Sequence, residues 1–316
     1  MIDLLRCDGR RHRRSENFAS VTTETISTMF IRVYRPVWRP ALELVGGVGV
    51  PHTPHFPLLA ERDDDLGREI TRLYAGVAAE LEAMRPDVVI LLSSDHYNTF
   101  FVSSLPIFSI VTASSASGPV DYRELQQRTV PMHAGLARRL QRELVNAEFD
   151  VGQTQELGLD HPMTIPLHFL MPDSKVPVIP LFVSGLMPPL PSVRRCYRFG
   201  QTLRAILTSF DDNLRVAVIA SGSFSLEIGG PSISDHSHTG VPDPRWVERV
   251  VDLMRNNDID LLLAEANADQ VTKAGNAGGE LLDWIAMLGA IAPSGPPAFL
   301  EAQIDWGHAY GAWHVG

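Results

Sequence analysis

The sequence predicts an α/β protein, a single three-layer α/β/α domain with a mostly parallel central sheet. Short apolar runs rich in β-branched residues, typical of strands buried on both faces, alternate with segments of helical periodicity. The first alternation is a strand over 42–50, a helix over 61–84 and a strand that begins at residue 87. This βαβ unit implies a parallel pair with a right-handed crossover. No internal repeat or linker divides the chain, so we expect one domain.

The composition is that of a globular protein with ample material for a core. The 316 residues are 45% hydrophobic and 20% charged, and the net charge of −10 argues against nucleic acid as a partner. No apolar run is long enough to cross a bilayer, so we expect no membrane partner. Cys7 and Cys196 are too few for a disulfide framework, which makes a cytoplasmic protein the expectation.

Residues 1–40 differ from the rest, and we expect a variable, flexible N-terminal extension ahead of a domain over 41–316. Five arginines fall within the first 14 residues, and Ser and Thr follow. A transit peptide has this composition, but acidic residues and the lack of an apolar signal core argue against one. A start of the native chain near Met29 is a further alternative.

The first two strands each deliver histidines at their carboxyl ends. The strand over 42–50 runs into a proline-fixed turn that holds His52 and His55 on a stiff loop. The strand that begins at residue 87 stops at Ser93-Ser94-Asp95-His96. Because ligands of open α/β sheets bind beyond the carboxyl ends of the strands, His96 is a candidate metal ligand or general base.

The remaining elements are assigned in the same way, from apolar periodicity and from turn residues. We expect strands over 105–112, 148–151 (an edge strand), 176–183 (edge or irregular, because of its prolines) and 214–220, and a C-terminal tail over 299–315 that returns to the sheet. We expect helices over 130–144, through 167–171 after a turn that carries Asp160 and His161, over 192–207 with Ser192 as N-cap, over 246–256 and 258–264 after a polar loop at 229–244, and an amphipathic helix over 280–288 after a glycine-rich turn.

Three of these positions form a candidate metal site. Two histidines and one carboxylate on separate loops, His52, His96 and Glu280, are the ligand set of a facial triad, which leaves positions open on non-haem Fe(II). A further histidine, His161, could move protons. The alternatives are a structural histidine in a proline-rich turn and, for Glu280, a solvated first-turn glutamate favoured by the helix dipole.

Other residues complete this hypothesis. His55 competes with His52, because both begin a His-x-Pro pattern. Asp95 and Asp160 would orient the histidines, with a turn or cap aspartate as the alternative. Three aromatic residues could line a pocket or pack in the core: Trp306, Tyr310 and Trp313.

Several motifs together resemble those of class III extradiol ring-cleavage dioxygenases, the superfamily of the protocatechuate 4,5-dioxygenase catalytic subunit. The resemblance runs in order from residue 46 to 288. It is carried by Pro51-His52-Thr53-Pro54, Ser94-Asp95-His96, the stretch from Asp160-His161-Pro162 to Leu167, Val178-Ile179-Pro180, the stretch from Pro191 to Cys196, Gly229-Gly230-Pro231 and Gly279-Glu280-Leu281.

This resemblance implies that residues 41–316 form a catalytic domain. His52, His96 and Glu280 would hold Fe(II), and His161 would lie over the substrate. The implied activity is extradiol cleavage of a catecholic ring with dioxygen. The implied partners are the small aromatic substrate and O2, with a homo-oligomer or a small accessory subunit around the pocket.

The sequence departs from the family at one catalytic position. The family has a histidine in the loop before Gly-Pro, and Leu226 stands there. Glu227, His236 or His238 could replace it, His161 could suffice, or the chemistry could differ. Two other functions therefore stay open: a zinc hydrolase that uses the same three ligands, and an inactive binding homologue.

Overall fold

The computed structural model describes residues 41–122, 125–173, 175–230 and 238–315. The N-terminal extension expected over 1–40 lies outside these residues, as does His236. Within the described residues no helix combines the length and apolarity that a bilayer crossing requires.

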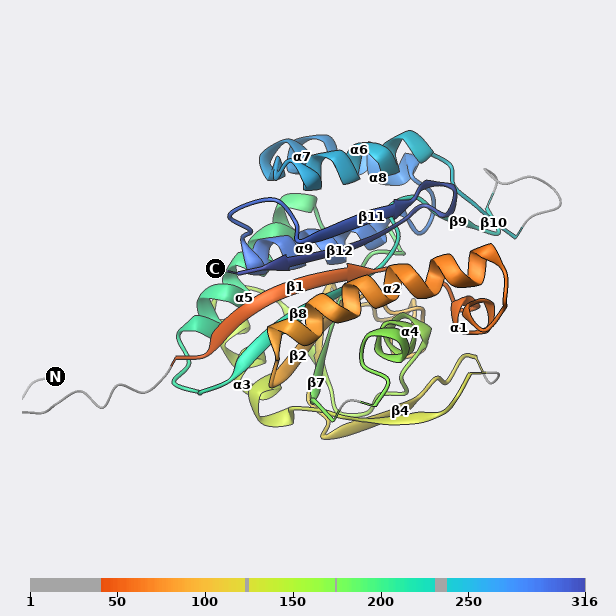
Figure 1. The fold of residues 1–316 in the computed structure, drawn as a ribbon. Coiled ribbons are helices and arrows are strands. Elements are labelled where there is room, and N and C mark those ends of the chain that lie inside the picture. The colour runs from red at the N-terminus through yellow and green to blue at the C-terminus, as the bar shows by residue number, and fades with distance from the viewer. Residues whose placement is uncertain (1–40, 123–124, 174, 231–237, 316) are drawn as a thin grey trace, which may run out of the picture. The chain divides into compact units, whose positions relative to one another are not determined.

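A mixed, mostly parallel eight-stranded sheet forms the centre (Figure 1). Its order is β11 (Phe299–Gln303), β12 (His308–His314), β1 (Glu43–Val50), β8 (Arg215–Ser221), β2 (Val88–Ser93), β7 (Val178–Val183), β3 (Phe108–Val111) and β6 (Val151–Thr154). The four central strands, β1, β8, β2 and β7, run parallel to one another. β12 is antiparallel to β1, and β3 is antiparallel to β7. The carboxyl ends of the central strands therefore meet the amino end of β12 at one edge.

Helices cover both faces of the sheet, because its central strands are apolar on both (Figure 1). In β2, Val88, Ile90 and Leu92 belong to one core cluster, while Val89 and Leu91 belong to the other. One face packs against α1 (Phe56–Ala60), α2 (Asp65–Met84) and α4 (His161–Leu170), and the other against α3 (Ala134–Asn146), α5 (Val193–Thr208), α6 (Pro244–Arg255), α7 (Ile259–Glu265) and α9 (Leu281–Ile291). The predicted three-layer α/β/α architecture is confirmed.

The pairing of β7 corrects one prediction. Its prolines suggested an edge or irregular strand, but β7 lies inside the sheet between β2 and β3. Val89 N donates to Pro177 O, and since alternate residues of a parallel strand face a given neighbour, the Pro180 amide position faces away from β2. On the other side, the pairs with β3 run from Leu181 to Val183 only. The missing N–H of Pro180 therefore removes no bond from either ladder.

Smaller corrections concern element boundaries and faces. β1 and β2 do not pair directly, because β8 lies between them. The helix expected from residue 130 begins at Ala134, since residues 128–131 form a short strand, and the edge strand expected over 148–151 is β6, three residues later. α9 is buried along its whole length rather than amphipathic. Unpredicted short elements are α1, α8 (Ala268–Lys273), β4 (Ser115–Gly118), β5 (Arg128–Pro131), β9 (Glu227–Ile228) and β10 (Thr239–Gly240).

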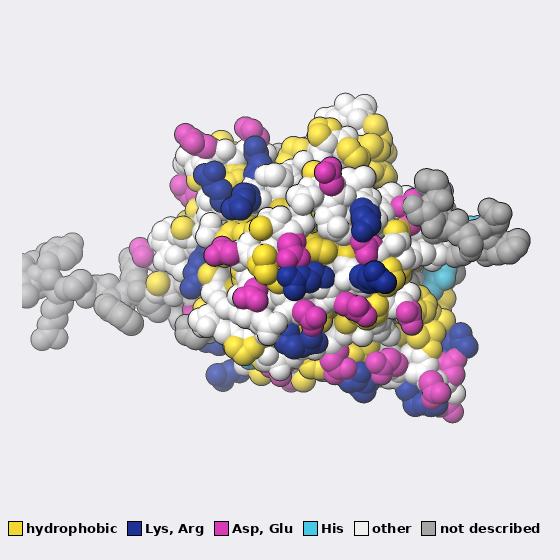
Figure 2. Space-filling view, turned by 90° about the horizontal axis from the view of Figure 1, so that it is seen from above, with side chains coloured by type: hydrophobic (Ala, Val, Ile, Leu, Met, Phe, Trp, Pro, Cys, Tyr) yellow, Lys and Arg dark blue, Asp and Glu magenta, His cyan; other side chains and the backbone are white. Residues whose placement is uncertain are grey.

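Charges of both signs intermix on the face drawn in Figure 2, where Lys and Arg side chains lie next to Asp and Glu. Ion pairs of this kind occur among the described residues, where Arg72 pairs with both Glu69 and Glu301, and Arg249 pairs with Glu265. This face therefore offers no extended basic surface of the kind that binds a phosphate backbone.

Candidate metal centre

The structure brings together His52, His96 and Glu280. His52 follows β1, His96 follows β2, and Glu280 is the last residue of a 3-10 turn that leads into α9. Glu280 Oε1 lies 3.2 Å from His52 Nε2 and 3.3 Å from His96 Nε2. The side chain of Glu280 is fully buried, and those of His52 and His96 are 6% and 15% exposed.

A hydrogen-bond chain from β8 fixes the tautomer of His52. Ser221 Oγ donates to the carbonyl oxygen of Pro162 at 2.7 Å, so its only proton is used. It must then accept from His52 Nδ1, which lies 2.9 Å away. In the neutral ring this leaves the Nε2 lone pair facing Glu280. Sequence reasoning missed Ser221, although its place directly after a buried strand was a signal.

Glu280 is ionised and has one oxygen without a hydrogen bond. Burial alone would raise its pKa, but positive charge and hydrogen bonds from His52 and His96, when their rings are protonated, outweigh burial and hold the pKa well below its ordinary value. Oε2 accepts from the backbone N of Ser223 at 2.8 Å. Within the described residues, Glu280 Oε1 and His96 Nε2 are buried without a hydrogen-bond partner.

A divalent cation fits these atoms. Neighbouring ligands of one ion, with bonds of roughly 2.0–2.2 Å, lie about 3 Å apart, close to the two separations at Glu280 Oε1. An anionic oxygen beside the nitrogen lone pair of His52 is unfavourable without a positive charge next to them. Two imidazoles and one carboxylate are the donors of a mononuclear site with open positions.

Close backbone contacts hold Glu280 in place. A Cβ on Gly279 would lie 2.0 Å from Gly185 O, and one on Gly222 would lie 2.6 Å from the Cβ of Glu280. Trp284, one turn after Glu280, donates from Nε1 to Gly222 O at 3.0 Å. These glycines therefore let neighbouring backbone segments approach closely, and this packing fixes the carboxylate against the end of β8.

His161 is the first residue of α4 and is anchored by Asp121. The carboxylate of Asp121 accepts from both the backbone N and the Nδ1 of His161. Burial lowers the pKa of His161 to about 4, although Asp121 works in the opposite direction. Burial raises the pKa of Asp121, but the bonds from His161 outweigh it, so the pKa is lowered. At neutral pH His161 therefore has a free Nε2 lone pair, and its ring lies 4.5 Å from that of His96.

Two donor sets are geometrically available. One ring nitrogen each of His52, His96 and His161 lie within 4.8 Å of one another and could bind a metal. Glu280 Oε1 lies closer than 4.8 Å to two of these residues, at 3.2 Å from His52 Nε2 and 3.3 Å from His96 Nε2. Leaving the buried carboxylate of Glu280 without a positive charge also costs more free energy than leaving the neutral imidazole of His161 unbound. We therefore favour Glu280 as third ligand, with His161 beside the ion as a base.

The structure also places the other residues considered for the site, which are Asp160, Asp95 and His55. Asp160 Oδ2 accepts from the backbone N of His96, and burial raises the pKa of Asp160 to about 7. It thus contacts the loop of His96, while Asp121 orients His161. Asp95 accepts from the backbone N of Thr99 and Phe100, as in the alternative of a turn aspartate. His55 is exposed.

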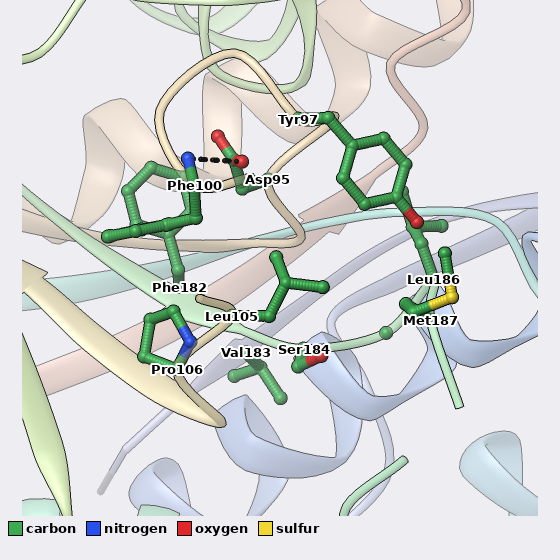
Figure 3. Close-up of a pocket in the computed structure, with 11 residues that line it drawn as sticks. Asp95, Tyr97, Phe100, Leu105, Pro106, Phe182, Val183, Ser184, Leu186 and Met187 are labelled. Atoms are coloured by element: carbon green, nitrogen blue, oxygen red, sulfur yellow. Dashed lines mark hydrogen bonds between the residues drawn. The ribbon is translucent and has the colours of Figure 1, made fainter. Parts of the chain in front are cut away.

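A small apolar pocket lies beneath the loop that carries His96 (Figure 3). Tyr97 has a φ of 62°, a left-handed conformation that costs a non-glycine residue energy and often occurs at functional sites. The pocket volume is about 20 Å³, which suits roughly one water molecule and no aromatic ring. Its walls include Phe100, Leu105, Phe182 and Leu186.

The loop expected to hold the family's catalytic histidine is paired with backbone from residues 274–277. Leu226 N donates to Ala274 O, and Leu226 O accepts from Ala277 N. Glu227 Oε2 accepts from the backbone N of Asn276, so this carboxylate is already used. His238 is exposed.

The three aromatic residues considered for a pocket divide between the core and its rim. Trp313 packs against Trp284 and Tyr310 against Tyr74, both in the core. Trp306 is half-buried against Phe56.

Comparisons with known proteins identify what this chain is similar to. The family model for the catalytic LigB subunit of aromatic ring-opening dioxygenase matches residues 46–308. Gallate dioxygenase of Pseudomonas putida is 33% identical over 162 residues, which cover 50% of this chain and 46% of that protein. This chain thus spans about half the length of that relative. The 2,3-dihydroxyphenylpropionate/2,3-dihydroxicinnamic acid 1,2-dioxygenase of Cupriavidus necator is 26% identical over 302 residues, 83% of this chain and 94% of that protein.

One solved structure shares the fold. An uncharacterized protein from Escherichia coli K12 superposes with a TM-score of 0.56 at 16% identity, over 86% of this chain and 100% of that chain. At this identity the likeness supports the architecture alone.

Proposed function

The chain belongs to the LigB family of catalytic subunits of aromatic ring-opening dioxygenases, and on this premise we propose that it is an Fe(II)-dependent extradiol dioxygenase. Family membership, an oxygenase function and an aromatic substrate cleaved with O2 follow from the comparisons, and the resemblance inferred from the motifs is confirmed. The metal, the position of ring cleavage and the ligand roles are our proposals.

One observation carries the proposal, namely the unpartnered Glu280 Oε1 between His52 Nε2 and His96 Nε2. When bound there, ferrous iron would hold a catechol and dioxygen side by side and offset their negative charge. Ser221 keeps the lone pair of His52 directed at this position, and Ser223 N holds the other carboxylate oxygen. The chain thus supplies a preorganised, water-poor site.

His161 is the proposed proton acceptor. Its Nδ1–H is held by Asp121, so a substrate hydroxyl that approaches the site meets the Nε2 lone pair. Removal of this proton would make the substrate oxygen an anionic chelator, and the same imidazole could return the proton later. In this scheme one imidazole suffices where the family uses a second histidine at the position of Leu226.

The test is anaerobic reconstitution with Fe(II), followed by oxygen uptake over a panel of catechols, gallates and aminophenols. The names of the relatives make gallate and 2,3-dihydroxyphenylpropionate the first substrates to try. We expect uptake that disappears in His52→Ala and His96→Ala and persists in His55→Ala, a matched histidine of the same turn. Activity that survives in the first two variants would refute the ligand assignment.

The same experiment separates the alternatives. Zinc in the protein as purified, with no oxygen uptake on any catechol, would indicate the hydrolase. A Leu226→His variant that gains turnover would show that the missing histidine limits the reaction. Neither alternative is favoured by the family assignment.

Three further proposals come from the sequence. They are a cytoplasmic location, a homo-oligomer or a small accessory subunit, and the division into an extension over 1–40 and a catalytic domain over 41–316.

A further inference from the structure

A fourth imidazole, that of His308, lies at the edge of the sheet that carries the site. β1 and β12 are antiparallel, with Gly46 opposite His314 and Gly49 opposite Gly311. Continuing this register by three residues places His308 level with His52. The hydrogen bond of 3.2 Å between His308 Nε2 and Thr53 Oγ1 agrees with this placement.

The backbone before His308 is clamped to the loop that follows β8. Gly307 O accepts from the backbone N of Phe224 at 2.8 Å and of Ser225 at 3.4 Å. Gly307 has a φ of +72°, and a Cβ there would lie 1.8 Å from Ser225 O, so only glycine fits. This clamp gives His308 a fixed starting point at the amino end of β12.

The His308 ring is buried, and only one of its two nitrogen atoms has a hydrogen-bond partner among the described residues. The residue is 1% exposed, and its ring packs edge-on against Phe56 at 5.5 Å. Burial lowers its pKa to about 3, so the ring is neutral at working pH. Nε2 is bonded to Thr53, and Nδ1 makes no hydrogen bond to any other described residue. A buried polar atom without a partner costs stability unless a ligand or water completes it.

The His308 ring lies near the proposed ligands but outside their cluster. His308 interacts electrostatically with both Glu280 and His52. The set of ring nitrogens within 4.8 Å of one another contains His52, His96 and His161 and does not extend to His308. His308 is therefore a neighbour of the proposed ligands and not one of the ring nitrogens that could share a single ion.

We propose that His308 Nδ1 forms a hydrogen bond to an oxygen atom of a reactant held in this site. The oxygen belongs either to a substrate hydroxyl or to dioxygen. The inference rests on the proposed function and assigns a further contact within it. The Thr53 hydroxyl and the Phe56 ring fix the imidazole plane, so the contact is preorganised.

Three substitutions separate this role from a structural one. In His308→Asn the side-chain amide lies near the place of Nδ1, in His308→Gln it lies near Nε2, and His308→Phe removes both. The readouts are thermal unfolding, anaerobic binding of 4-nitrocatechol to the Fe(II) protein, and the KM and kcat for dioxygen. His314→Gln, on the same strand but exposed and bonded to Glu80, is the control that should change none of them.

We expect His308→Asn to stay within about threefold of the wild type, because the polar atom at Nδ1 is kept. His308→Gln and His308→Phe should lose about 10- to 100-fold, the range for a hydrogen bond to a charged group. A loss in 4-nitrocatechol affinity would identify a substrate oxygen, and a raised KM for O2 would identify dioxygen. Either outcome supports the proposal.

A reversed ranking of His308→Asn and His308→Gln would overturn the proposal. If His308→Gln matches the wild type while His308→Asn and His308→Phe unfold at lower temperature, the imidazole only anchors Thr53. If the wild type cleaves no catechol, the proposed function fails, but 4-nitrocatechol binding still judges His308. A loss in His308→Gln that His308→Asn does not share supports the contact. Because the contact with dioxygen falls together with the proposed function, equal 4-nitrocatechol binding in both variants refutes the contact that remains.

Discussion

The two ends of the same parallel strands treat charged residues in opposite ways. At the amino ends, Arg215 of β8 donates to Glu43 of β1 at 2.6 Å and to the carbonyl oxygens of Met84 and Arg85. Its backbone N donates to Asp87, just before β2, at 2.8 Å. The charges there are partly exposed, and each of these groups has a partner.

At the carboxyl ends the charged residues are buried and incompletely paired. Glu280 is fully buried, whereas the side chains of Arg215 and Glu43 are 35% and 59% exposed. Glu280 Oε1 lies 3.2 Å and 3.3 Å from the Nε2 atoms of His52 and His96 and has no hydrogen-bond partner among the described residues. The comparison shows that the charged groups at the amino ends are paired by other groups of the chain. Those at the carboxyl ends need a cation as their partner.

The largest expected effect comes from removing the unpaired buried charge at the carboxyl ends of the strands. Glu280→Gln keeps an oxygen for Ser223 N and turns an NH2 toward His52 and His96. We expect the metal-free variant to be at least as stable as the wild type and to bind metal at least about 100-fold more weakly, since even residues that only orient ligands are worth about 10–100-fold.

Thermal unfolding with and without metal measures this effect. At 100 times its Kd, a metal should stabilise the wild type by about 2.7 kcal/mol. The same metal concentration should stabilise Glu280→Gln by no more than about 0.4 kcal/mol. Equal stabilisation of both proteins would place the ion elsewhere.

A smaller loss is expected when the orientation of a ligand is released. Ser221→Ala frees His52 Nδ1 and should weaken metal binding by about 10–100-fold, as measured by anaerobic titration. Ser225→Ala is the matched control, because Ser225 is buried and bonded to Ala274 O without touching an imidazole. If both variants lose metal affinity equally, the serine acts through the fold and not through His52.

Asp121 and Asp160 can be ranked by their effect on turnover. Asp121→Asn removes the charge that holds His161 Nδ1–H, so kcat should fall about tenfold or more while metal affinity stays unchanged. Asp160→Asn can keep an acceptor for the backbone N of His96 and should lower kcat less. Steady-state kinetics decide, and the reverse order would assign His161 to Asp160.

The smallest effect is expected at the amino end. Arg215→Met removes partly exposed bonds and should lower the free energy of unfolding by only about 1 kcal/mol, as measured by urea denaturation. Metal affinity and turnover per folded molecule should stay as in the wild type. A change in either would mean that the two ends are coupled.

The sequence predicted what local patterns determine. Apolar runs buried on both faces identified the central strands, and their abrupt polar ends placed His52 and His96 at one edge. Ser192 was predicted as an N-cap and accepts from Arg195 N. In each of these, the residues that decide the structure are neighbours in the sequence.

Contacts between distant segments were not predictable in this way. Asp121 meets His161 across 40 residues, and Thr53 meets His308 across 255. Neither pairing leaves a periodic signal, because each depends on where a loop or a returning strand arrives in the folded chain. The interior position of β7 was missed for a similar reason, since the tolerance for Pro180 depends on where the ladder with β3 stops.

Anomalous diffraction at the iron edge from crystals reconstituted with Fe(II) tests the central claim most directly. The account predicts one peak bonded to His52 Nε2, His96 Nε2 and Glu280 Oε1, with His161 and His308 beyond bonding distance. A peak bonded to His161 while Glu280 stays unbound, or no peak at this edge of the sheet, would contradict it.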